Sequence, residues 1–397
     1  MSRGRLALAL GAVTYLAAWA FGSLALYPVA LGLVLAAVGA RLWVRVAGAP
    51  VQLARRFGRG DHLEGDDVWV TLTLDRESRV PLGAATVRER ISKLGERETR
   101  VHRSRGRLEG AYVLERVPRG CYAYEHAEVV LDDPFGLERV TMAVAVGGAV
   151  VVHPRLVELD ALFSESGAHA QGGRRLLLRR PSGFDLHSVR EHQEGESLRR
   201  VHWRSTAKRG VLMVKELEDA PRDEVAVVLD AAAGAIAGAS FEEQVRAAGS
   251  ILRAHVRRGR RAVLVCAGAR TDSVRVSSED GDWRTALDIL AGAEPDGMRS
   301  LADVLTGEGG AAQALELVVV TARLEHRLGD RLVQRAQAHR TVSLVFVDTV
   351  SFAGRRARPE PELLRLQAAG VQVAVVRRGD DLRAALGLRR SAGAARA

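Results

Sequence analysis

The chain has 397 residues, of which 47% are apolar and 27% charged, and a formal net charge of +10. The length predicts two or three domains, and the apolar fraction excludes a chain that is disordered throughout. All but three of the 58 basic residues are arginines, which lie between acidic residues along the chain, and aromatic residues make up only 5%. Nucleic-acid binding is therefore not expected. Two distant cysteines, Cys121 and Cys266, exclude a disulfide framework.

The first element is an uncharged, apolar run from residue 6 to residue 40. As one straight helix it would extend about 52 Å, whereas the hydrocarbon core of a bilayer is about 30 Å thick. Gly22-Ser23 and Tyr27-Pro28 lie near the middle of the run and predict a turn. Residues 1–48 are therefore expected to form a transmembrane hairpin of two helices. A cleaved signal peptide is disfavoured because its apolar region would be much shorter.

Arginines flank the apolar run on both sides, with Arg3 and Arg5 before it and Arg41 and Arg45 after it. Positive charge favours the cytoplasmic side of a membrane. The protein is therefore expected in the cell membrane, with the lipid bilayer as a partner and both termini in the cytoplasm. A reducing cytoplasm also suits two unpaired cysteines.

Residues 49–158 contain short stretches of alternating polar and apolar residues, separated by turn signals such as Gly147-Gly148. This pattern is typical of antiparallel strands in an all-β, sandwich-like module. The expected strands are residues 68–74, 107–117, 127–131, 140–146 and 149–152. Nothing in their composition indicates chemistry, so a scaffold or protein contact is the expected role.

Residues 223–388 alternate nearly continuous apolar runs with helical segments. This alternation predicts an α/β, doubly wound domain with a mostly parallel sheet buried on both faces. The expected strands are residues 224–230, 261–267, 315–321, 341–348 and 371–376. A helix is expected from residue 240, and others at 282–293, 327–339, 360–369 and 380–386. Ser240 and Glu243 predict a capping box at the start of the first helix, and the tail 389–397 is expected to be disordered.

Ligands of such sheets bind at the carboxyl ends of the strands. The first strand ends there in Asp230, which three alanines follow, and the third expected strand is followed by Arg323. A divalent cation needs several oxygen ligands, and this edge offers one carboxylate and an arginine. No G-x-G-x-x-G or Walker-type loop follows any of the strands. No metal or cofactor is therefore expected, and Asp230 is expected to brace a loop.

The connecting segment, residues 159–222, carries a dense group of charged, His and Trp residues between positions 182 and 218. The structural interpretation is an ion-pair network that joins the two modules, because arginine suits bidentate ion pairs. Its members would be Arg190, Glu196, Arg199 and Arg204, with Trp203 packed in the seam. The alternative interpretation is a surface on which a partner protein docks.

Chemical interpretations of this segment are weaker. His187, His192 and His202 could ligate a metal, but spacings of five and ten residues are not those of a zinc site. Glu196 and His202 could form the acid/base pair of a hydrolase, yet nothing supplies a nucleophile or a substrate pocket. A further alternative is binding of anionic lipid or nucleic acid by the arginines, which predicts steep salt dependence. The protein is not expected to be an enzyme.

The same segment resembles the signature of the domain-of-unknown-function 58 family, which reads approximately R-x-Y-x-x-G-D-x-x-R-x-I-[HD]-W-x-x-[ST]-A-[RK]. His192 stands here for the usual Tyr and Glu196 for the usual Asp. Residues 133–137 and 152–156 resemble two further landmarks of the family. The signature positions are occupied by Arg190, Gly195, Glu196, Arg199, His202, Trp203, Thr206, Ala207 and Lys208, with Lys215 and Glu218 after them.

The resemblance implies a membrane-anchored protein whose carboxyl-terminal part is similar to a von Willebrand factor A domain. Family members are commonly encoded beside MoxR-type AAA+ ATPases and transglutaminase-like membrane proteins, which implies protein partners of these kinds. The metal site of A domains has the form D-x-S-x-S, and Asp230, Ala232 and Gly234 occupy these positions here. Because both serines are missing, the site looks degenerate. The expected function is that of a membrane-anchored, non-enzymatic adaptor in a chaperone-like or envelope-linked system.

Overall fold

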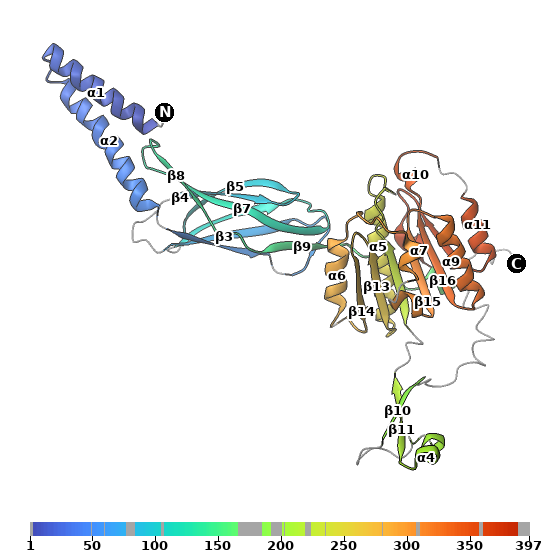
Figure 1. Cartoon of the computed structure of the whole chain (residues 1–397). Helices are drawn as coiled ribbons and strands as arrows, with labels where there is room; N and C mark the ends of the chain where they lie inside the picture. Colours follow the sequence, from blue (N-terminus) through green and yellow to red (C-terminus); the bar gives the residue numbers. More distant parts are fainter. Residues whose placement is uncertain are drawn as a thin grey trace. The chain divides into compact units, whose positions relative to one another are not determined.

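The computed structural model of the chain describes residues 3–48, 50–58, 60–76, 84–104, 107–165, 185–191, 201, 203–218, 224–234, 236–279, 281–306, 310–356 and 360–387. The chain divides into two compact units, Met1–His153 and Pro154–Ala397 (Figure 1). The first unit contains two helices and a β-rich module, and the second contains a mixed sheet with its helices.

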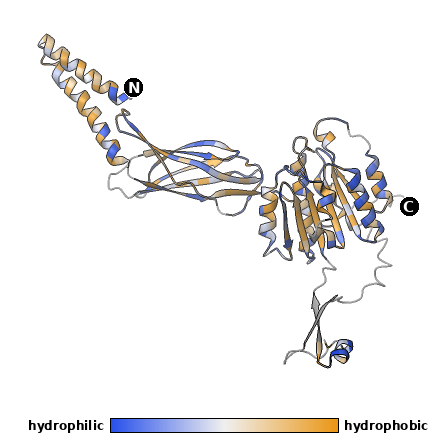
Figure 2. Ribbon diagram, in the orientation of Figure 1, coloured by the Kyte–Doolittle hydropathy of each residue, from blue (hydrophilic) through white to orange (hydrophobic). Residues whose placement is uncertain are grey.

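The helices α1 (Arg3–Phe21) and α2 (Leu26–Ala47) form a hairpin that is mostly apolar (Figure 2). The chain turns at Gly22, whose φ of +64° favours glycine, and the Ser23 N–H donates to the Ala18 carbonyl at 3.0 Å. Pro28 lies in the first turn of α2, where its missing N–H needs no partner. The predicted turn is therefore confirmed.

Small residues fill the contact between the two helices. At Gly11 a Cβ atom would lie 2.9 Å from Val34 Cγ2, so a larger residue would push the helices apart. The large side chains of Leu16, Trp19 and Leu35 remain 61, 73 and 60% exposed. Both helices are long and apolar enough to cross a membrane. The buried residues of the pair are Gly4, Gly11, Ala18, Ala30, Ala37, Ala40 and Ala47.

The β-rich module forms one hydrogen-bonded path with the strand order β1-β3-β6-β5-β4-β7-β9-β2, and β8 pairs with β7. Every neighbouring pair is antiparallel except β2 with β9. The sequence pattern identifies β3 and β6 to β9 but misses β1, β2, β4 and β5, because β4 and β5 carry charged residues at most outward positions. The strands of this module within the described residues are β1 (Val51–Phe57), β2 (His62–Leu63), β3 (Val68–Arg76), β4 (Ala84–Ile91), β5 (Gly95–Ser104), β6 (Arg107–Leu114), β7 (Gly120–Asp132), β8 (Arg139–Ala143) and β9 (Ala149–His153).

A buried ion pair shows how this sheet encloses its core. Three strands separate β1 from β4, a distance of about 19 Å across a flat sheet at ~4.8 Å per strand. Nevertheless Arg55 Nε on β1 lies 2.5 Å from Glu89 Oε1 on β4, and both side chains are buried. The sheet must therefore curl until β1 approaches β4. The Tyr112 hydroxyl donates to Glu89 Oε2 at 2.8 Å, and the Arg55 guanidinium lies 4.4 Å from the centre of the Tyr124 ring.

The second unit is built on a six-stranded sheet of order β14-β13-β12-β15-β16-β17, in which only β13 and β14 are antiparallel. Its strands are β12 (Val225–Asp230), β13 (Ala262–Ala267), β14 (Thr271–Val276), β15 (Glu316–Thr321), β16 (Thr341–Val347) and β17 (Gln372–Val376). The helices around it are the 3-10 turn η1 (Phe163–Glu165), α5 (Ser240–Arg257), α6 (Trp283–Gly292), α7 (Leu301–Val304), α8 (Gly310–Gln313), α9 (His326–Gln337), α10 (Thr349–Phe352), α11 (Pro361–Ala368) and α12 (Leu382–Leu386).

Apolar side chains cover both faces of this sheet, and helices lie on each face (Figure 1). Val227 and Leu229 of β12 pack into the core formed with α5, α6 and α12, whereas Ala226 and Val228 pack into the core formed with α7, α9 and α11. The prediction of strands buried on both faces is therefore confirmed. The expected strands and long helices are present, but the sequence pattern misses β14, because this edge strand is mostly exposed.

The predicted capping box at α5 is wrong. The N-cap residue is Ala239, and the Ser240 Oγ accepts a hydrogen bond from the Ala237 N–H at 3.0 Å in the preceding turn. Glu243 forms an ion pair with Arg246 at 2.7 Å. Ser240 is buried as the first residue of the helix, and its hydroxyl accepts from the preceding turn and does not cap the helix.

The first unit ends at His153, before the module boundary expected at residue 158. The residues that follow belong to the second unit because they pack on α5. The Val157 N–H donates to Ser250 Oγ at 3.0 Å, and Glu158 pairs with Arg257 at 2.6 Å. Leu156 occupies the notch at Gly249, where a Cβ atom would lie 2.6 Å from its side chain. Local patterning does not reveal such contacts, because the partners lie more than 90 residues apart.

Candidate functional site

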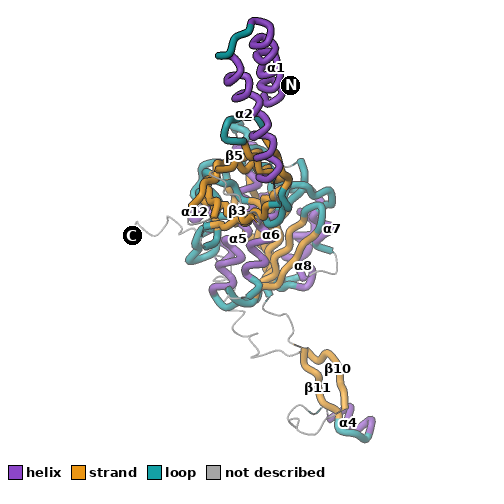
Figure 3. The backbone as a smooth tube through the Cα atoms, turned by 90° about the vertical axis from the view of Figure 1, so that its left-hand side faces the viewer, coloured by secondary structure: helices purple, strands orange, loops and turns teal. Residues whose placement is uncertain are grey.

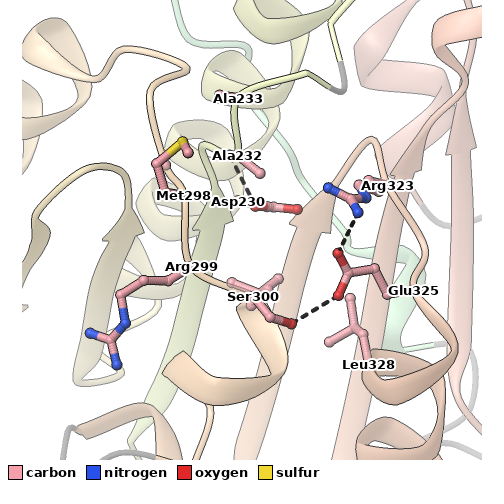
Figure 4. Close-up of a pocket in the computed structure, with 11 residues that line it drawn as sticks. Asp230, Ala232, Ala233, Met298, Arg299, Ser300, Arg323, Glu325 and Leu328 are labelled. Carbon is pink, nitrogen blue, oxygen red and sulfur yellow. Dashed lines mark hydrogen bonds and ion pairs between the residues drawn. The ribbon is translucent and has the colours of Figure 1, made fainter.

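A pocket of about 290 Å³ lies at the carboxyl ends of β12 and β15 (Figure 4). From β12 the chain continues to β13 on one side, and from β15 it continues to β16 on the other. The loops therefore diverge at this point and leave a crevice, which is where open α/β sheets bind ligands. The lining residues are Asp230, Ala232, Ala233, Gly297, Met298, Arg299, Ser300, Leu301, Arg323, Glu325 and Leu328.

One wall of the pocket is fixed by Gly297. Its N–H donates to the Ala231 carbonyl at 2.8 Å, and its own carbonyl accepts from the Ala233 N–H at 2.8 Å. A Cβ atom at this position would lie 2.7 Å from the Ala267 carbonyl oxygen and 2.9 Å from that of Ala231. Only glycine permits this close approach of two backbones, which holds the following residues 298–300 beside Asp230.

We expect Gly297→Ala to lower the free energy of unfolding of the second unit by about 1–3 kcal/mol, because the added methyl group overlaps two backbone oxygens. The measurement is denaturant-dependent hydrogen exchange of β12 and β13. Gly281→Ala is the matched control, since nothing lies within 4 Å of its Cβ position, and it should change the same quantity by less than about 0.5 kcal/mol. Equal losses in both variants would contradict the close approach.

Asp230 joins the ends of the two central strands. Its Oδ2 accepts a hydrogen bond from the Thr321 hydroxyl at 2.6 Å, and its Oδ1 accepts from the Ala232 N–H at 3.1 Å. Burial raises the pKa of Asp230, and the two hydrogen bonds oppose this effect. Thr321 Oγ1 also accepts from the Arg323 N–H at 2.9 Å. The carboxyl group of Asp230 thus orders the loops after both β12 and β15.

A second carboxylate, Glu325, lies on the opposite side of the pocket (Figure 4). Arg323 Nη2 lies 2.9 Å from Glu325 Oε1, and the Ser300 hydroxyl donates to Glu325 Oε2 at 2.9 Å. The Arg323 side chain is 55% exposed, so it keeps donors that face solvent. Met298 is 88% exposed at the same site. The pocket therefore presents guanidinium donors and an apolar side chain, while its two acids are engaged within the chain.

These donors do not form a metal cage. Ala232 and Gly234, which follow Asp230 on its loop, carry no side-chain oxygen. Among the residues that the structure describes, no group of three or more His, Cys, Asp or Glu side chains could hold a metal ion. Arg323 adds a positive charge beside Asp230, which opposes cation binding.

The sequence pattern identifies Asp230 and Arg323 but misses Thr321, Ser300 and Gly297. The pairing of β12 with β15 explains why Thr321 belongs to the site. Leu229 of β12 pairs with Val320 of β15, so the last residues of the two strands, Asp230 and Thr321, lie side by side. No strand pairing places Ser300 and Gly297 at the site, because their loop reaches the pocket only through the tertiary fold.

The signature segment forms a small hairpin of its own. Strand β10 (Asp185–Glu191) pairs antiparallel with β11 (Met213–Glu218), and helix α4 (Trp203–Arg209) lies between them in the chain (Figure 3). The Met213 N–H donates to Thr206 Oγ1 at 3.0 Å, which links the helix to β11. Strand β11 begins at Met213, because the preceding residues complete the turn after α4.

Only part of the signature can be placed. Arg190 lies opposite Val214 on the hairpin, next to the pair of Val189 and Lys215, and Glu218 pairs with Asp185. Arg204, Ala207 and Lys208 are exposed on α4. Trp203 is 68% exposed on α4, and its packing in a seam between the modules stays a prediction. Gly195, Glu196, Arg199 and His202 lie outside the described residues, and with them the predicted ion-pair network and the alternative acid/base pair.

Many arginines of the described structure are paired within the chain. Arg139 lies 2.6 Å from Asp132, Arg260 2.7 Å from Glu316, and Arg365 2.5 Å from Asp330. Each of these arginines therefore has its charge balanced by a neighbouring carboxylate.

A family model described as "Protein of unknown function DUF58" matches residues 188–352. The chain is 25% identical over 290 residues to the uncharacterized protein YeaD of Bacillus subtilis (strain 168), across 69% of this chain and 70% of that protein. Among solved structures, Cwp6 from Clostridium difficile matches with 9% identity and a TM-score of 0.21, across 84% of this chain and 51% of that chain. The resemblance indicated by the signature residues is thus confirmed over the region that contains most of the hairpin and the whole pocket.

Proposed function

We propose that this protein is a membrane-anchored, non-enzymatic adaptor that binds a protein partner through the pocket face of its second unit. The observation that carries the proposal is the arrangement of α1 and α2. Their small residues face each other and their large apolar residues face outward, as in Leu16, Trp19 and Leu35. A soluble protein would bury these side chains, whereas a bilayer accepts them.

The proposed anchor has two spans with both termini in the cytoplasm. Arg3 and Arg5 at one end, and Arg41 and Arg45 near the other, support this orientation. A reporter that fluoresces only in the cytoplasm, fused after residue 397, should be active, and the protein should leave the membrane fraction only with detergent. A chain that is released without detergent would overturn the anchor.

The proposed fold of the second unit is a doubly wound, A-type domain. Numbered along the chain, its strands lie in the order 3-2-1-4-5-6, and its pocket lies where the connections diverge. Family resemblance supports the A-type assignment. For the first unit, the curled sheet that brings Arg55 to Glu89 supports a sandwich-like module.

The chemistry of the pocket supports binding rather than catalysis. Asp230 and Glu325 use their oxygens to hold neighbouring loops, while Arg323 and Met298 face solvent. Exposed arginine and methionine side chains are common at protein interfaces. A partner that offers carboxylates or backbone carbonyls beside an apolar side chain would fit this surface. From the family resemblance, we assign the partner as a MoxR-type AAA+ ATPase, with a transglutaminase-like membrane protein as a further member of the assembly.

The test is binding of the detergent-purified chain to the purified MoxR-type ATPase of the same organism. We expect Arg323→Ala to weaken binding by about tenfold or more, because exposed interface arginines are common hot spots. Arg331→Ala is the matched control, since Arg331 is an exposed arginine of the same unit that lies outside this pocket. Absence of wild-type binding would overturn the assigned partner, and equal losses in both variants would overturn the assigned face.

A further inference from the structure

The turn between β7 and β8, residues 133–138, holds an exposed aromatic side chain in a fixed position. Asp133 is buried, and its two carboxylate oxygens accept hydrogen bonds from the N–H groups of Phe135 at 2.7 Å and Glu138 at 2.5 Å. Gly136 adopts a φ of +67°, which completes the turn. This arrangement leaves Phe135 66% exposed. The turn therefore presents the Phe135 side chain to solvent in a fixed position.

The same turn touches the helical hairpin of the first unit. The Gly4 N–H in the first turn of α1 donates to the Leu137 carbonyl at 2.9 Å. Arg41 of α2 lies 3.3 Å from Glu138, forming an ion pair. Figure 1 shows the end of the β7–β8 hairpin beside the N-terminal end of α1. Two independent contacts therefore hold the turn against both helices.

These contacts fix the level of the turn along the helices. The uncharged run extends from residue 6 to residue 40, so Gly4 and Arg41 mark its two ends. If the run spans the bilayer, Gly4 and Arg41 lie where the hydrocarbon core meets the headgroups. Aromatic side chains are favoured at this depth, because they combine apolar area with tolerance of the polar interface.

We propose that Phe135 inserts into the headgroup–acyl boundary of the same bilayer that holds α1 and α2, so that the turn at residues 133–138 is a second membrane contact. This inference rests on the proposed membrane anchor. The occupant of the Phe135 surface is lipid rather than protein, because the turn that carries Phe135 contacts the ends of two apolar helices. With this contact, the turn at residues 133–138 holds the β-rich module at the membrane in addition to the two helices. This restricts the rotation of the module relative to the membrane plane.

The test uses an environment-sensitive fluorophore on single cysteines, in a Cys121→Ser, Cys266→Ala background, with the full chain in nanodiscs of phosphatidylcholine and phosphatidylglycerol. We expect the label at Phe135→Cys to emit at a shorter wavelength than the control label. We also expect a nitroxide placed near the lipid headgroups to quench it severalfold more strongly than the control label. The matched control is Trp69→Cys. Trp69 of β3 is 61% exposed and lies beside the end of β1 that is distant from α2, because its carbonyl accepts from the Gly58 N–H.

A third label, at Leu16→Cys on α1, tests the membrane anchor independently of the Phe135 contact. Leu16 should be quenched by a nitroxide deep in the acyl chains. If Leu16 is quenched but the label at position 135 behaves like that at position 69, the anchor stands and the Phe135 contact is wrong. If Leu16 is not quenched, both proposals fail. Circular dichroism of each labelled chain checks that the fold is retained.

Discussion

Glu89→Gln should destabilise the β-rich module by about 3–5 kcal/mol, because it leaves the Arg55 guanidinium buried without its counter-charge. The two side chains are 1% and 6% exposed, and Arg55 Nη2 already has no hydrogen-bond partner. Glutamine retains the shape of the side chain. With its oxygen facing Arg55, its amide N–H can donate to the Tyr112 hydroxyl, which can in turn donate to Tyr124, so the loss reports mainly the charge. The pair also joins β1, the strand after the helical hairpin of α1 and α2, to β4. The effect should therefore reach both strands.

The measurement is denaturant-dependent hydrogen exchange of β1 and β4 in the detergent-purified chain, since a chain of two units has no single unfolding transition. Glu98→Gln is the control. It removes the charge that pairs with Arg88, but these side chains are 60% and 44% exposed, so the loss should not exceed about 1 kcal/mol. Adding Arg55→Met to Glu89→Gln should recover most of the stability. Failure of this rescue would contradict the role of the buried charge.

Acidification should destabilise the second unit through His255. This residue on α5 is buried, and its Nδ1 lies 3.1 Å from Arg260 Nη1, which must donate, so the imidazole is neutral. Burial, followed by the positive charges of Arg260 and Arg258, lowers the pKa of His255 from 6.5 to about 3. As the pH falls, His255 is therefore protonated at a higher pH in the unfolded chain than in the folded chain. The stability from neutral His255 is complete above pH 6.5 and is lost towards pH 3, by about 2–3 kcal/mol between pH 6.5 and 4.5.

His255→Gln should remove this part of the pH dependence, because glutamine does not titrate and its amide oxygen can still accept from Arg260. The measurement is denaturant-dependent hydrogen exchange of α5 and β13 at a series of pH values. His339→Asn is the matched control: His339 is exposed in the same unit, and asparagine tolerates its φ of 58°. Its pH profile should follow that of the wild type. A His255→Gln profile as steep as the wild type would mean that other groups cause the acid sensitivity.

Elements whose side chains repeat with a clear period are predictable from the sequence. The apolar runs of β12, β13, β15, β16 and β17 and the break at Gly22 are examples, because each reflects burial on known faces or a backbone conformation that few residues adopt. The strands β4 and β14 are not predictable in this way. Their outward residues are charged or polar, and their pairing depends on neighbours elsewhere in the chain.

The residues of the candidate site likewise divide into those that the sequence predicts and those that it does not. Asp230 and Arg323 are visible in the sequence because they come directly after apolar strands. The hydrogen bond from Thr321 to Asp230 joins residues 91 positions apart, and only the register of β12 and β15 brings them together. Ser240 illustrates the opposite error: its sequence context fits a capping box, but its hydroxyl accepts from the Ala237 N–H in the turn before α5.

The sequence by itself determined that this chain contains two apolar helices, followed by strands and then by an α/β domain, because hydropathy and periodicity are local properties. Only the tertiary structure decided that Arg55 meets Glu89, that Gly297 forms the wall beside Asp230, and that the turn carrying Phe135 rests against α1 and α2. Each of these contacts joins distant segments through close packing and hydrogen-bond geometry. Such geometry depends on how sheets curl and how loops approach, which no local pattern records.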